Sequence, residues 1–223
     1  MLAEILPPEV MAAEAFGDLP DAVLFPAEEA VIARAVDKRR REFTTARACA
    51  RAALARLGLP PAAILPGAAG APQWPPGVVG SMTHCAGYRG SAVAWARDVL
   101  ALGLDAEPDA PLPEGVLGTV AVADERAALR ALAQAAPAPC WDRLLFSAKE
   151  SVYKAWFPLT GRWLGFEDAV ITFDAAGGTF AARLLVPGPR LDGRLLTGFT
   201  GRWLARDGLV LTAIAVPRGV TPG

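Results

Sequence analysis

In the second half of the chain the sequence reads Ser147-Ala148-Lys149-Glu150-Ser151-Val152-Tyr153-Lys154. This stretch lies within a segment from Trp141 to Phe157, whose spacing of apolar residues predicts a helix that ends at Pro158. Glu150 and Lys154 stand four residues apart, so they share one face of that helix. An exposed Glu–Lys pair would explain the spacing, and so would a carboxylate and a cation that act together on a ligand.

The placement of lysine favours a ligand. Of the 223 residues only three are lysines and one is a histidine, whereas the rest of the basic charge is arginine. Lys149 and Lys154 both fall in the predicted helix. A lysine ammonium is a compact point charge that binds phosphate groups well.

Two carboxylates follow an apolar strand in the segment Gly103-Leu104-Asp105-Ala106-Glu107. Asp105 and Glu107 are two residues apart, so in extended backbone they point to the same side. They could be the start of a solvated turn before Pro108. They could also be hard oxygen ligands for Mg²⁺, or Mn²⁺ in its place, with Glu150 as a third carboxylate and a substrate phosphate completing the set.

The only histidine ends the segment Gly80-Ser81-Met82-Thr83-His84, which follows the pattern of a strand. His84 could be a buried structural residue, or it could contact a phosphate with help from Thr83. Upstream, the basic run Lys38-Arg39-Arg40-Arg41 leads into a helix that also carries Arg47. This run could be a solvated helix face or a clamp on a phosphate or an adenine ring.

Composition excludes several classes of protein. A net charge of −1 argues against a general nucleic-acid binder. No apolar run reaches the length of a membrane span, and the N-terminus lacks the pattern of a signal peptide. The three cysteines are widely spaced, which indicates small buried side chains and a reducing compartment, the cytoplasm.

The remaining pattern indicates an α+β fold. We expect a loop-rich lead-in over residues 1–30. The other predicted elements are a helix from about Glu28 to Arg56, a helix from Asp124 to about Ala135, and strands over Val78–Met82, Ser91–Trp95, Val99–Asp105, Ala169–Phe173, Phe180–Leu185, Leu195–Trp203 and Leu209–Val216. Phe43–Arg47 aligns weakly with Phe146–Glu150. This repeat predicts two pseudo-symmetric α+β halves, residues 1–97 and residues 98–223, with a ligand site in the cleft between them.

Aromatic residues gather after the lysines of the predicted helix. An apolar docking stripe for a protein partner could be formed by Tyr153, Trp156, Phe157, Leu159 and Trp163, with Arg162 alongside, or these residues could simply be core. The sequence leaves both interpretations open.

Taken in order, these segments resemble the Sfp-type (EntD-like) 4′-phosphopantetheinyl transferases, particularly actinobacterial members. The resemblance is carried by the basic run with Arg47, by Ser81–Arg89, and by the pairing of Gly103–Glu107 with Lys149–Lys154. It covers about residues 28–216. One departure is the loop 65–72, where family members often carry a lysine and this chain has no basic residue.

The resemblance implies an enzyme that uses coenzyme A as co-substrate, and it assigns roles to particular residues. Catalytic roles fall to Asp105, Glu150 and Lys154, metal ligation to Asp105, Glu107 and Glu150, and coenzyme A binding to Arg39, Arg47, Thr83, His84, Lys149 and Lys154. A serine of an apo acyl or peptidyl carrier protein would receive the phosphopantetheine arm, and 3′,5′-ADP would leave. Such a protein would be a monomer that serves fatty acid, polyketide or nonribosomal peptide synthesis.

Two other functions share these residues. A Mg²⁺-dependent nucleotide pyrophosphate hydrolase would use the same carboxylates and lysines. A non-catalytic module that binds nucleotides or carrier proteins would leave the acids as solvated turn residues.

Overall fold

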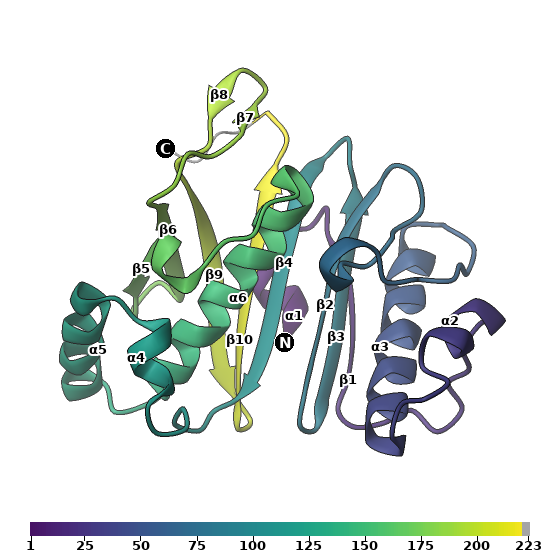
Figure 1. Ribbon diagram of the computed structural model, residues 1–223, viewed down its shortest axis with the longest axis horizontal. Helices are drawn as coiled ribbons and strands as arrows, with labels where there is room; N and C mark the ends of the chain where they lie inside the picture. The colour runs from purple at the N-terminus through teal and green to yellow at the C-terminus, as the bar shows by residue number, and fades with distance from the viewer. Residues whose placement is uncertain (220–223) are drawn as a thin grey trace.

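The computed structural model describes residues 1–219 and has a mixed α+β fold (Figure 1), as predicted. The helices are α1 (Leu2–Ile5), α2 (Pro26–Val31), α3 (Asp37–Arg56), α4 (Val116–Val120), α5 (Ala123–Ala135) and α6 (Trp141–Thr160), with short 3₁₀ turns η1 (Ala68–Gly70) and η2 (Phe166–Asp168). The strands are β1 (Met11–Ala15), β2 (Val78–Cys85), β3 (Tyr88–Trp95), β4 (Val99–Pro108), β5 (Ala169–Asp174), β6 (Thr179–Leu184), β7 (Arg190–Leu191), β8 (Arg194–Leu195), β9 (Gly198–Arg206) and β10 (Leu209–Pro217).

The first sheet is antiparallel in the order β1-β3-β2, and α3 packs on one of its faces. The buried side of α3 is built mainly from small residues, among them Ala46, Ala50 and Ala53. Small side chains let the helix axis approach the sheet closely, and Leu54 and Phe43 fill the ends of the contact. The helix ends before Gly58, whose φ of +79° is a conformation that favours glycine.

The second sheet has the order β4-β10-β9-β6-β5, and α6 lies on one face of it (Figure 1). Side chains of β4 alternate between its two faces. Leu102, Leu104 and Ala106 enter the core shared with the first sheet, whereas Ala101 belongs to the core beneath α6. Asp105 and Glu107, in phase with Ala101, therefore point to the side of α6.

Side chains from the first sheet join it to the second. The Ser81 hydroxyl accepts a hydrogen bond from the Leu104 backbone N–H (3.0 Å), and the Thr83 hydroxyl accepts one from the Ala106 N–H (3.0 Å). Both hydroxyls are buried. They provide hydrogen-bond acceptors for backbone N–H groups on the edge of β4 that faces away from β10. Strand β2 therefore lies beside β4 without backbone–backbone hydrogen bonds between the two strands.

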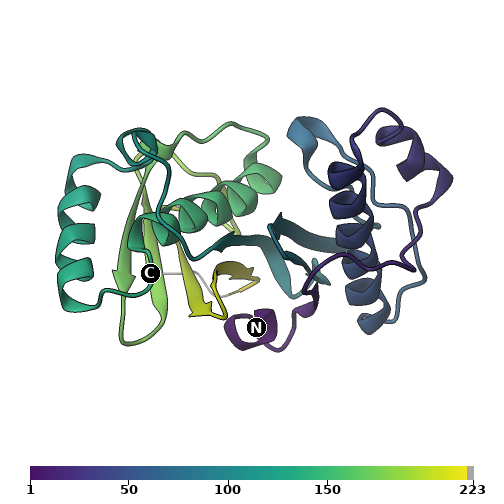
Figure 2. The same ribbon diagram turned by 90° about the horizontal axis from the view of Figure 1, so that it is seen from below.

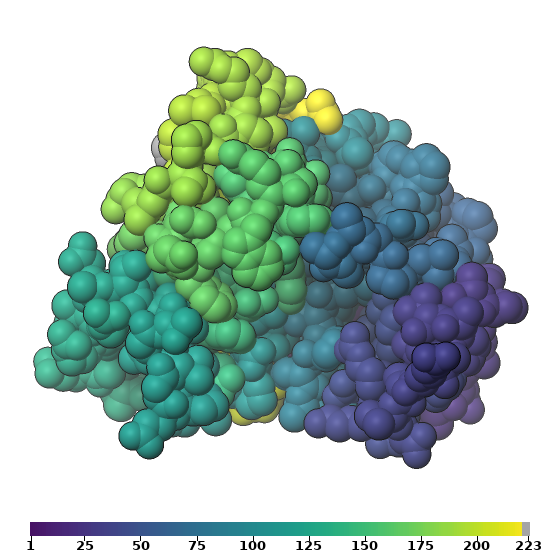
Figure 3. Space-filling view, in the orientation of Figure 1, coloured from purple at the N-terminus to yellow at the C-terminus, as the bar shows by residue number. Residues whose placement is uncertain are grey.

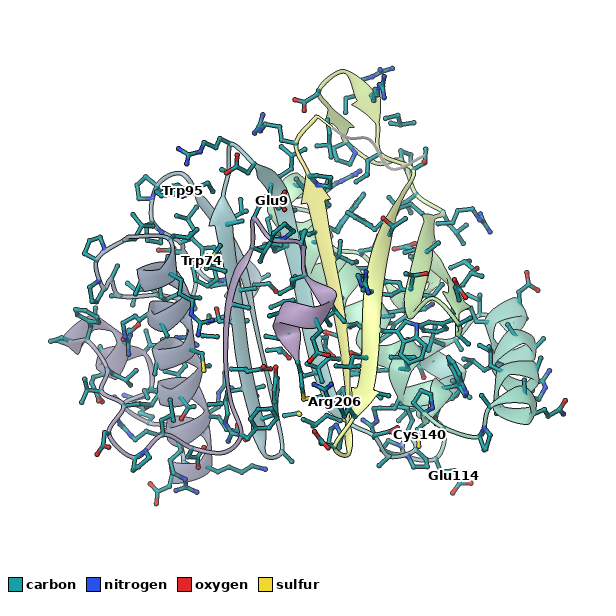
Figure 4. All side chains as sticks on the ribbon, turned by 180° about the vertical axis from the view of Figure 1, so that it is seen from behind. Glu9, Trp74, Trp95, Glu114, Cys140 and Arg206 are labelled. Carbon is teal, nitrogen blue, oxygen red and sulfur yellow. The ribbon has the colours of Figure 1, made fainter. Side chains whose placement is uncertain are left out.

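Helix α1 closes the opposite side of this junction. Figure 2 shows α1 on the side of the sheets away from α6, and Figure 4 shows it from behind, across β10 and beside β1. Leu2 and Ile5 are buried in the core that contains Leu104 and Leu211. The ion pair between Glu4 and Arg206 (2.6 Å; Arg206 is labelled in Figure 4) holds the helix to β9.

Three local predictions are corrected by the structure. Residues 1–30 contain the edge strand β1, which is only five residues long and rich in alanine, so its sequence shows no clear alternation of apolar and polar residues. The single helix expected from Glu28 to Arg56 is divided into α2 and α3. Helix α6 continues through Pro158 and ends at Thr160, because a proline in the last turn removes only one hydrogen bond.

The predicted division at Arg97–Asp98 falls between β3 and β4, the last strand of the first sheet and the first strand of the second. The symmetry of two halves and their bounds stay predictions, and residues 220–223 of the expected second half lie outside the described residues. Within residues 1–219 no helix is both long and apolar enough to cross a membrane.

Gly103 sets the distance between α6 and β4, and we predict that Gly103→Ala destabilises the protein by about 1–3 kcal/mol or more. A Cβ at this position would lie 2.0 Å from the Ser151 carbonyl oxygen and 3.0 Å from the Ala155 nitrogen, and both are backbone atoms that cannot rotate away. Urea unfolding measures the loss. Gly118→Ala in α4 is the matched control, since its Cβ would meet nothing within 4 Å. Equal stability of the two variants would contradict the close approach.

Candidate active site

Two carboxylates of β4 each meet a cation from α6. The Lys154 ammonium lies 2.7 Å from Asp105 Oδ1, and the Arg143 guanidinium lies 3.1 Å from Glu107 Oε2. Arg143, Glu150 and Lys154 are seven and four residues apart, so the helical repeat places them along one side of α6. The antiparallel approach of α6 to β4 thus builds a row of alternating charges that neither element has alone.

Asp105 is oriented by contacts to only one of its two oxygens. Oδ1 accepts a hydrogen bond from Lys154 Nζ and a long one from Thr83 Oγ1 (3.4 Å). Oδ2 is buried and has no hydrogen-bond partner within residues 1–219. A buried carboxylate oxygen without a partner is costly to fold, which indicates that a ligand completes its coordination.

The acidic charge of this site exceeds what its cations neutralise. Burial raises the pKa of Glu150, and the neighbouring Asp105 raises it further, while Lys154 opposes both effects. Burial and then Asp105 also raise the pKa of Glu107, against Arg143. Three carboxylates therefore share two cations, Lys154 and Arg143, and a further positive charge would stabilise the set.

These residues fit a divalent cation. Carboxylate oxygens are the ligands that Mg²⁺ prefers, and the unpartnered Asp105 Oδ2 offers one. Within the part of the chain that the structure describes, no three acidic, histidine or cysteine side chains are already gathered as a metal cluster. Mg²⁺ usually keeps waters and substrate phosphates among its ligands, so such a cluster is not required. The set Asp105, Glu107 and Glu150 stays a prediction.

A second group of cations lies on the first-sheet side of the site. Arg39 donates to His84 Nε2 at 2.7 Å, which assigns the ring proton to Nδ1. His84 is exposed at one side, but partial desolvation of its ring lowers its pKa, and Arg39 and Lys154 lower it further. Arg39, Lys154 and His84 thus lie close enough to favour an anion between β2, the start of α3 and α6.

Arg47 is held in a buried position near this group. Its guanidinium lies 3.5 Å from the centroid of the Phe43 ring, and its Nε donates to the Ile64 carbonyl. Burial lowers the pKa of Arg47 to about 10, and the repulsion of Arg39 contributes to the shift. A buried guanidinium next to other cations is a favourable partner for a phosphate.

Lys149 does not join the row of charges at β4. Its ammonium lies 2.8 Å from Glu125 Oε2 and donates to the carbonyls of Phe166 and Ala169. Glu125 in turn accepts from the Ile171 backbone N–H, so the pair ties α5 and β5 to α6. Both side chains are buried, and the structure gives Lys149 a structural partner that the sequence did not indicate.

The aromatic residues after Lys154 divide between core and surface. Trp156 is buried, whereas Trp163 is 76% exposed and its ring lies 5.0 Å from that of Tyr153, which also packs on Phe157. Trp163 and Tyr153 border a cavity of about 130 Å³ that also contacts Glu150. The rest of the cavity wall comes mainly from apolar side chains, Val152, Leu164 and Phe166 among them. In the space-filling view the end of α6 (green) adjoins the segment before β2 (blue) on this face (Figure 3).

Sequence reasoning missed Arg143 and Glu125. Arg143 stands seven residues before Glu150 and eleven before Lys154, so the helical repeat could have placed it on the same face. Glu125 carried no such signal, because its partner Lys149 is in another helix. Thr83 is buried, and its hydroxyl contacts Asp105 and the Ala106 backbone N–H, while its expected place beside a bound phosphate stays a prediction.

The fold and the site define an α+β protein with an acidic, cation-flanked centre suited to a phosphate-bearing ligand. Comparison with known families agrees. The family described as 4′-phosphopantetheinyl transferase N-terminal domain matches residues 27–94, and the 4′-phosphopantetheinyl transferase superfamily matches residues 101–203.

Curated relatives match along nearly the whole chain. The 4′-phosphopantetheinyl transferase Svp of Streptomyces mobaraensis is 60% identical over 219 residues, which are 97% of this chain and 89% of the relative. The 4′-phosphopantetheinyl transferase Npt of Nocardia iowensis is 54% identical (96% and 99%), and the 4′-phosphopantetheinyl transferase PptT of Mycobacterium tuberculosis is 51% identical (97% and 98%). The chain belongs to the 4′-phosphopantetheinyl transferase superfamily, as its motifs predicted.

The buried pair suggests a test of what Lys149 does. We predict that Lys149→Met lowers the free energy of unfolding by about 3–5 kcal/mol, because Glu125 is left as an unpaired buried charge. Urea unfolding measures this loss, and the double variant Lys149→Met/Glu125→Gln should recover part of it. A Lys149→Met protein of normal stability that binds coenzyme A poorly would instead assign Lys149 to the ligand.

Proposed function

We propose that this chain transfers the 4′-phosphopantetheine arm of coenzyme A to a serine hydroxyl of an apo acyl or peptidyl carrier protein and releases 3′,5′-ADP. Membership of the family supports this reaction, and so do the names of the three relatives. The observation that carries it is the site itself: Asp105 has one buried oxygen without a partner, lies 2.7 Å from Lys154, and is near enough to Glu150 to raise the pKa of that carboxyl group.

Two parts of the site would bind the phosphates of coenzyme A. The pyrophosphate would lie at Lys154 and the β4 carboxylates, and the adenosine 3′-phosphate would lie at Arg39, Arg47 and His84. The hydrogen bond between Arg39 and His84 supports the second assignment, because it holds the guanidinium and the imidazole ring close together. These residues would bind the 3′-phosphate in place of a loop lysine, because the loop 65–72 has no basic residue.

Mg²⁺, or Mn²⁺ in its place, would be held by Asp105, Glu107 and Glu150 and would neutralise charge on the pyrophosphate. Glu150 would accept the proton of the serine hydroxyl, and its raised pKa makes it a better base than an exposed carboxylate. The serine oxygen forms a bond to the β-phosphorus as the bond to the bridging oxygen breaks. Lys154 stabilises the charge that develops on the departing 3′,5′-ADP.

The cavity beside Glu150 would hold the apolar part of the pantetheine arm. Its walls are mainly apolar, and it adjoins the proposed base, which is where the arm must begin. The exposed ring of Trp163 would then lie at the entrance, where a carrier protein approaches. We propose that the enzyme acts as a cytoplasmic monomer, and its three cysteines are unpaired thiols, which suits a reducing compartment.

Mass spectrometry of an apo carrier protein incubated with the enzyme, coenzyme A and Mg²⁺ tests the proposed reaction. Transfer adds one phosphopantetheine unit to the carrier protein. Release of 3′,5′-ADP without that gain would indicate a pyrophosphate hydrolase, and no change in either would indicate a binding module.

In the same assay we predict that Asp105→Asn and Glu150→Gln each reduce transfer by at least a hundredfold. Glu150→Gln removes the proposed base, and positioned proton transfer contributes about 10²–10⁴-fold. Asp105→Asn removes a charged ligand of the proposed metal ion. Both substitutions keep the shape of the side chain, so circular dichroism and the melting temperature should show an intact fold. Turnover near that of the parent enzyme in folded Glu150→Gln would remove Glu150 from its role.

His84 should bind coenzyme A in a pH-dependent way. In the free protein its pKa lies below the usual 6.5, and an adjacent phosphate would raise it. Binding should therefore take up a proton, and the affinity for coenzyme A should increase as the pH falls from 8 to 6. Calorimetry in two buffers of different ionisation enthalpy measures the proton uptake. His84→Gln should abolish it and weaken coenzyme A binding while sparing dephospho-coenzyme A, and equal losses for both ligands would exclude contact with the 3′-phosphate.

Trp163 separates the docking of the carrier protein from the stability of the fold. We predict that Trp163→Ala raises the KM for the carrier protein several-fold and leaves the melting temperature within a degree or so, because the side chain is largely exposed. Trp156→Ala is the matched control, and it should unfold the protein at lower temperature because Trp156 is buried. An unchanged KM would place the docking surface elsewhere.

A further inference from the structure

Arg143 is the best-fixed cation in the site. Its guanidinium makes three hydrogen bonds: Nε to the Ala110 carbonyl (2.9 Å), one terminal nitrogen to the Pro111 carbonyl (3.0 Å) and the other to Glu107 Oε2 (3.1 Å). The side chain is 16% exposed. Both carbonyls belong to the loop that follows β4, so Arg143 connects the end of β4 to the first turn of α6.

These contacts fix the side chain of Arg143, and they hold only one of the two carboxylate oxygens of Glu107. The two carbonyl bonds fix the plane of the guanidinium, and its remaining nitrogen meets one carboxylate oxygen. Oε1 of Glu107 makes no hydrogen bond within residues 1–219. A carboxylate that is held through one oxygen presents its other oxygen in a defined direction. It is already oriented before a ligand binds, so binding costs little further rotational freedom.

The neighbouring carboxylate repeats this arrangement. Asp105 is held through Oδ1 by Lys154 and keeps Oδ2 free, and Glu107 is held through Oε2 by Arg143 and keeps Oε1 free. Glu150, between the two cations on α6, has no ion pair of its own among the described residues. Each β4 carboxylate thus has one anchored and one available oxygen.

We infer that Arg143 is a positioning residue, which anchors Glu107 so that its free oxygen is placed for a divalent cation. The inference rests on the metal set of the proposed function. It assigns a role to a residue outside the two acidic motifs, at the point where α6 begins. Arg143 does not touch the substrate in this role and acts only through Glu107.

Direct Mn²⁺ binding tests the inference without measuring transfer. The free Mn²⁺ signal in electron paramagnetic resonance gives the Kd, in the presence and absence of coenzyme A. On charge alone, removal of a cation beside the metal would tighten binding. We expect the opposite for Arg143→Gln, a Kd raised roughly tenfold, as is typical when the hydrogen-bond partner of a metal ligand is removed.

Two further variants separate positioning from other effects. Arg143→Lys keeps the charge but cannot make the three bonds, so we expect a Kd between those of the parent and Arg143→Gln. Arg143→Gln/Glu107→Gln should bind no more weakly than Glu107→Gln alone. Arg206→Gln breaks a comparable Arg–Glu pair behind the molecule (Figure 4) and should leave the Kd unchanged.

The outcomes distinguish this inference from the proposed function. A Kd for Arg143→Gln that is unchanged or lower, or a loss that adds to that of Glu107→Gln, would overturn the positioning role. If Asp105→Asn and Glu150→Gln weaken Mn²⁺ binding but Glu107→Gln does not, the role of Arg143 also fails while the proposed reaction stands. If none of the three carboxylate variants changes the Kd, the metal set itself is wrong. Should Arg143→Gln fold poorly, Arg143→Lys gives the same comparison.

Discussion

The backbone N–H and C=O groups on the outer edge of β4 must find side-chain hydrogen-bond partners, and the rest of the structure depends on this constraint. The strand pairs with β10 on one side only. On the other side the hydroxyls of Ser81 and Thr83 accept from its N–H groups, and Lys154 donates to the carbonyl of Leu104. Buried backbone groups left unpaired would cost about 1–3 kcal/mol each. These contacts join both sheets and α6 at a single strand.

The same contacts bring unlike charges together at the end of β4. Thr83 and Lys154 hold one oxygen of Asp105 and leave the other buried and free. Gly103 allows α6 to approach so closely that Glu150 faces this carboxylate. The negative charge that results is unfavourable in the free protein. A ligand that brings a divalent cation and phosphates neutralises this charge. The site therefore lowers the stability of the free protein and favours binding of the ligand.

Periodicity alone predicted the elements that carry the site. The helical face of α6, the strands β2 and β4, and the two-residue spacing of Asp105 and Glu107 all follow from local rules. Strand β1 escaped prediction because five residues rich in alanine do not show a clear alternation. The end of α6 was also misplaced, since Pro158 interrupts a pattern that the tertiary packing continues.

By itself the sequence determined the class of fold, the family and the face of each element on which acidic and basic residues lie. These properties depend on neighbours along the chain and on motif order. Only the tertiary structure decided which cation meets which carboxylate. It assigned Lys149 to the buried Glu125 in another helix, placed Thr83 against β4, and brought Arg143 to Glu107. Such pairings are set by the distance and direction in which α6 and the two sheets pack, and no local pattern records these quantities.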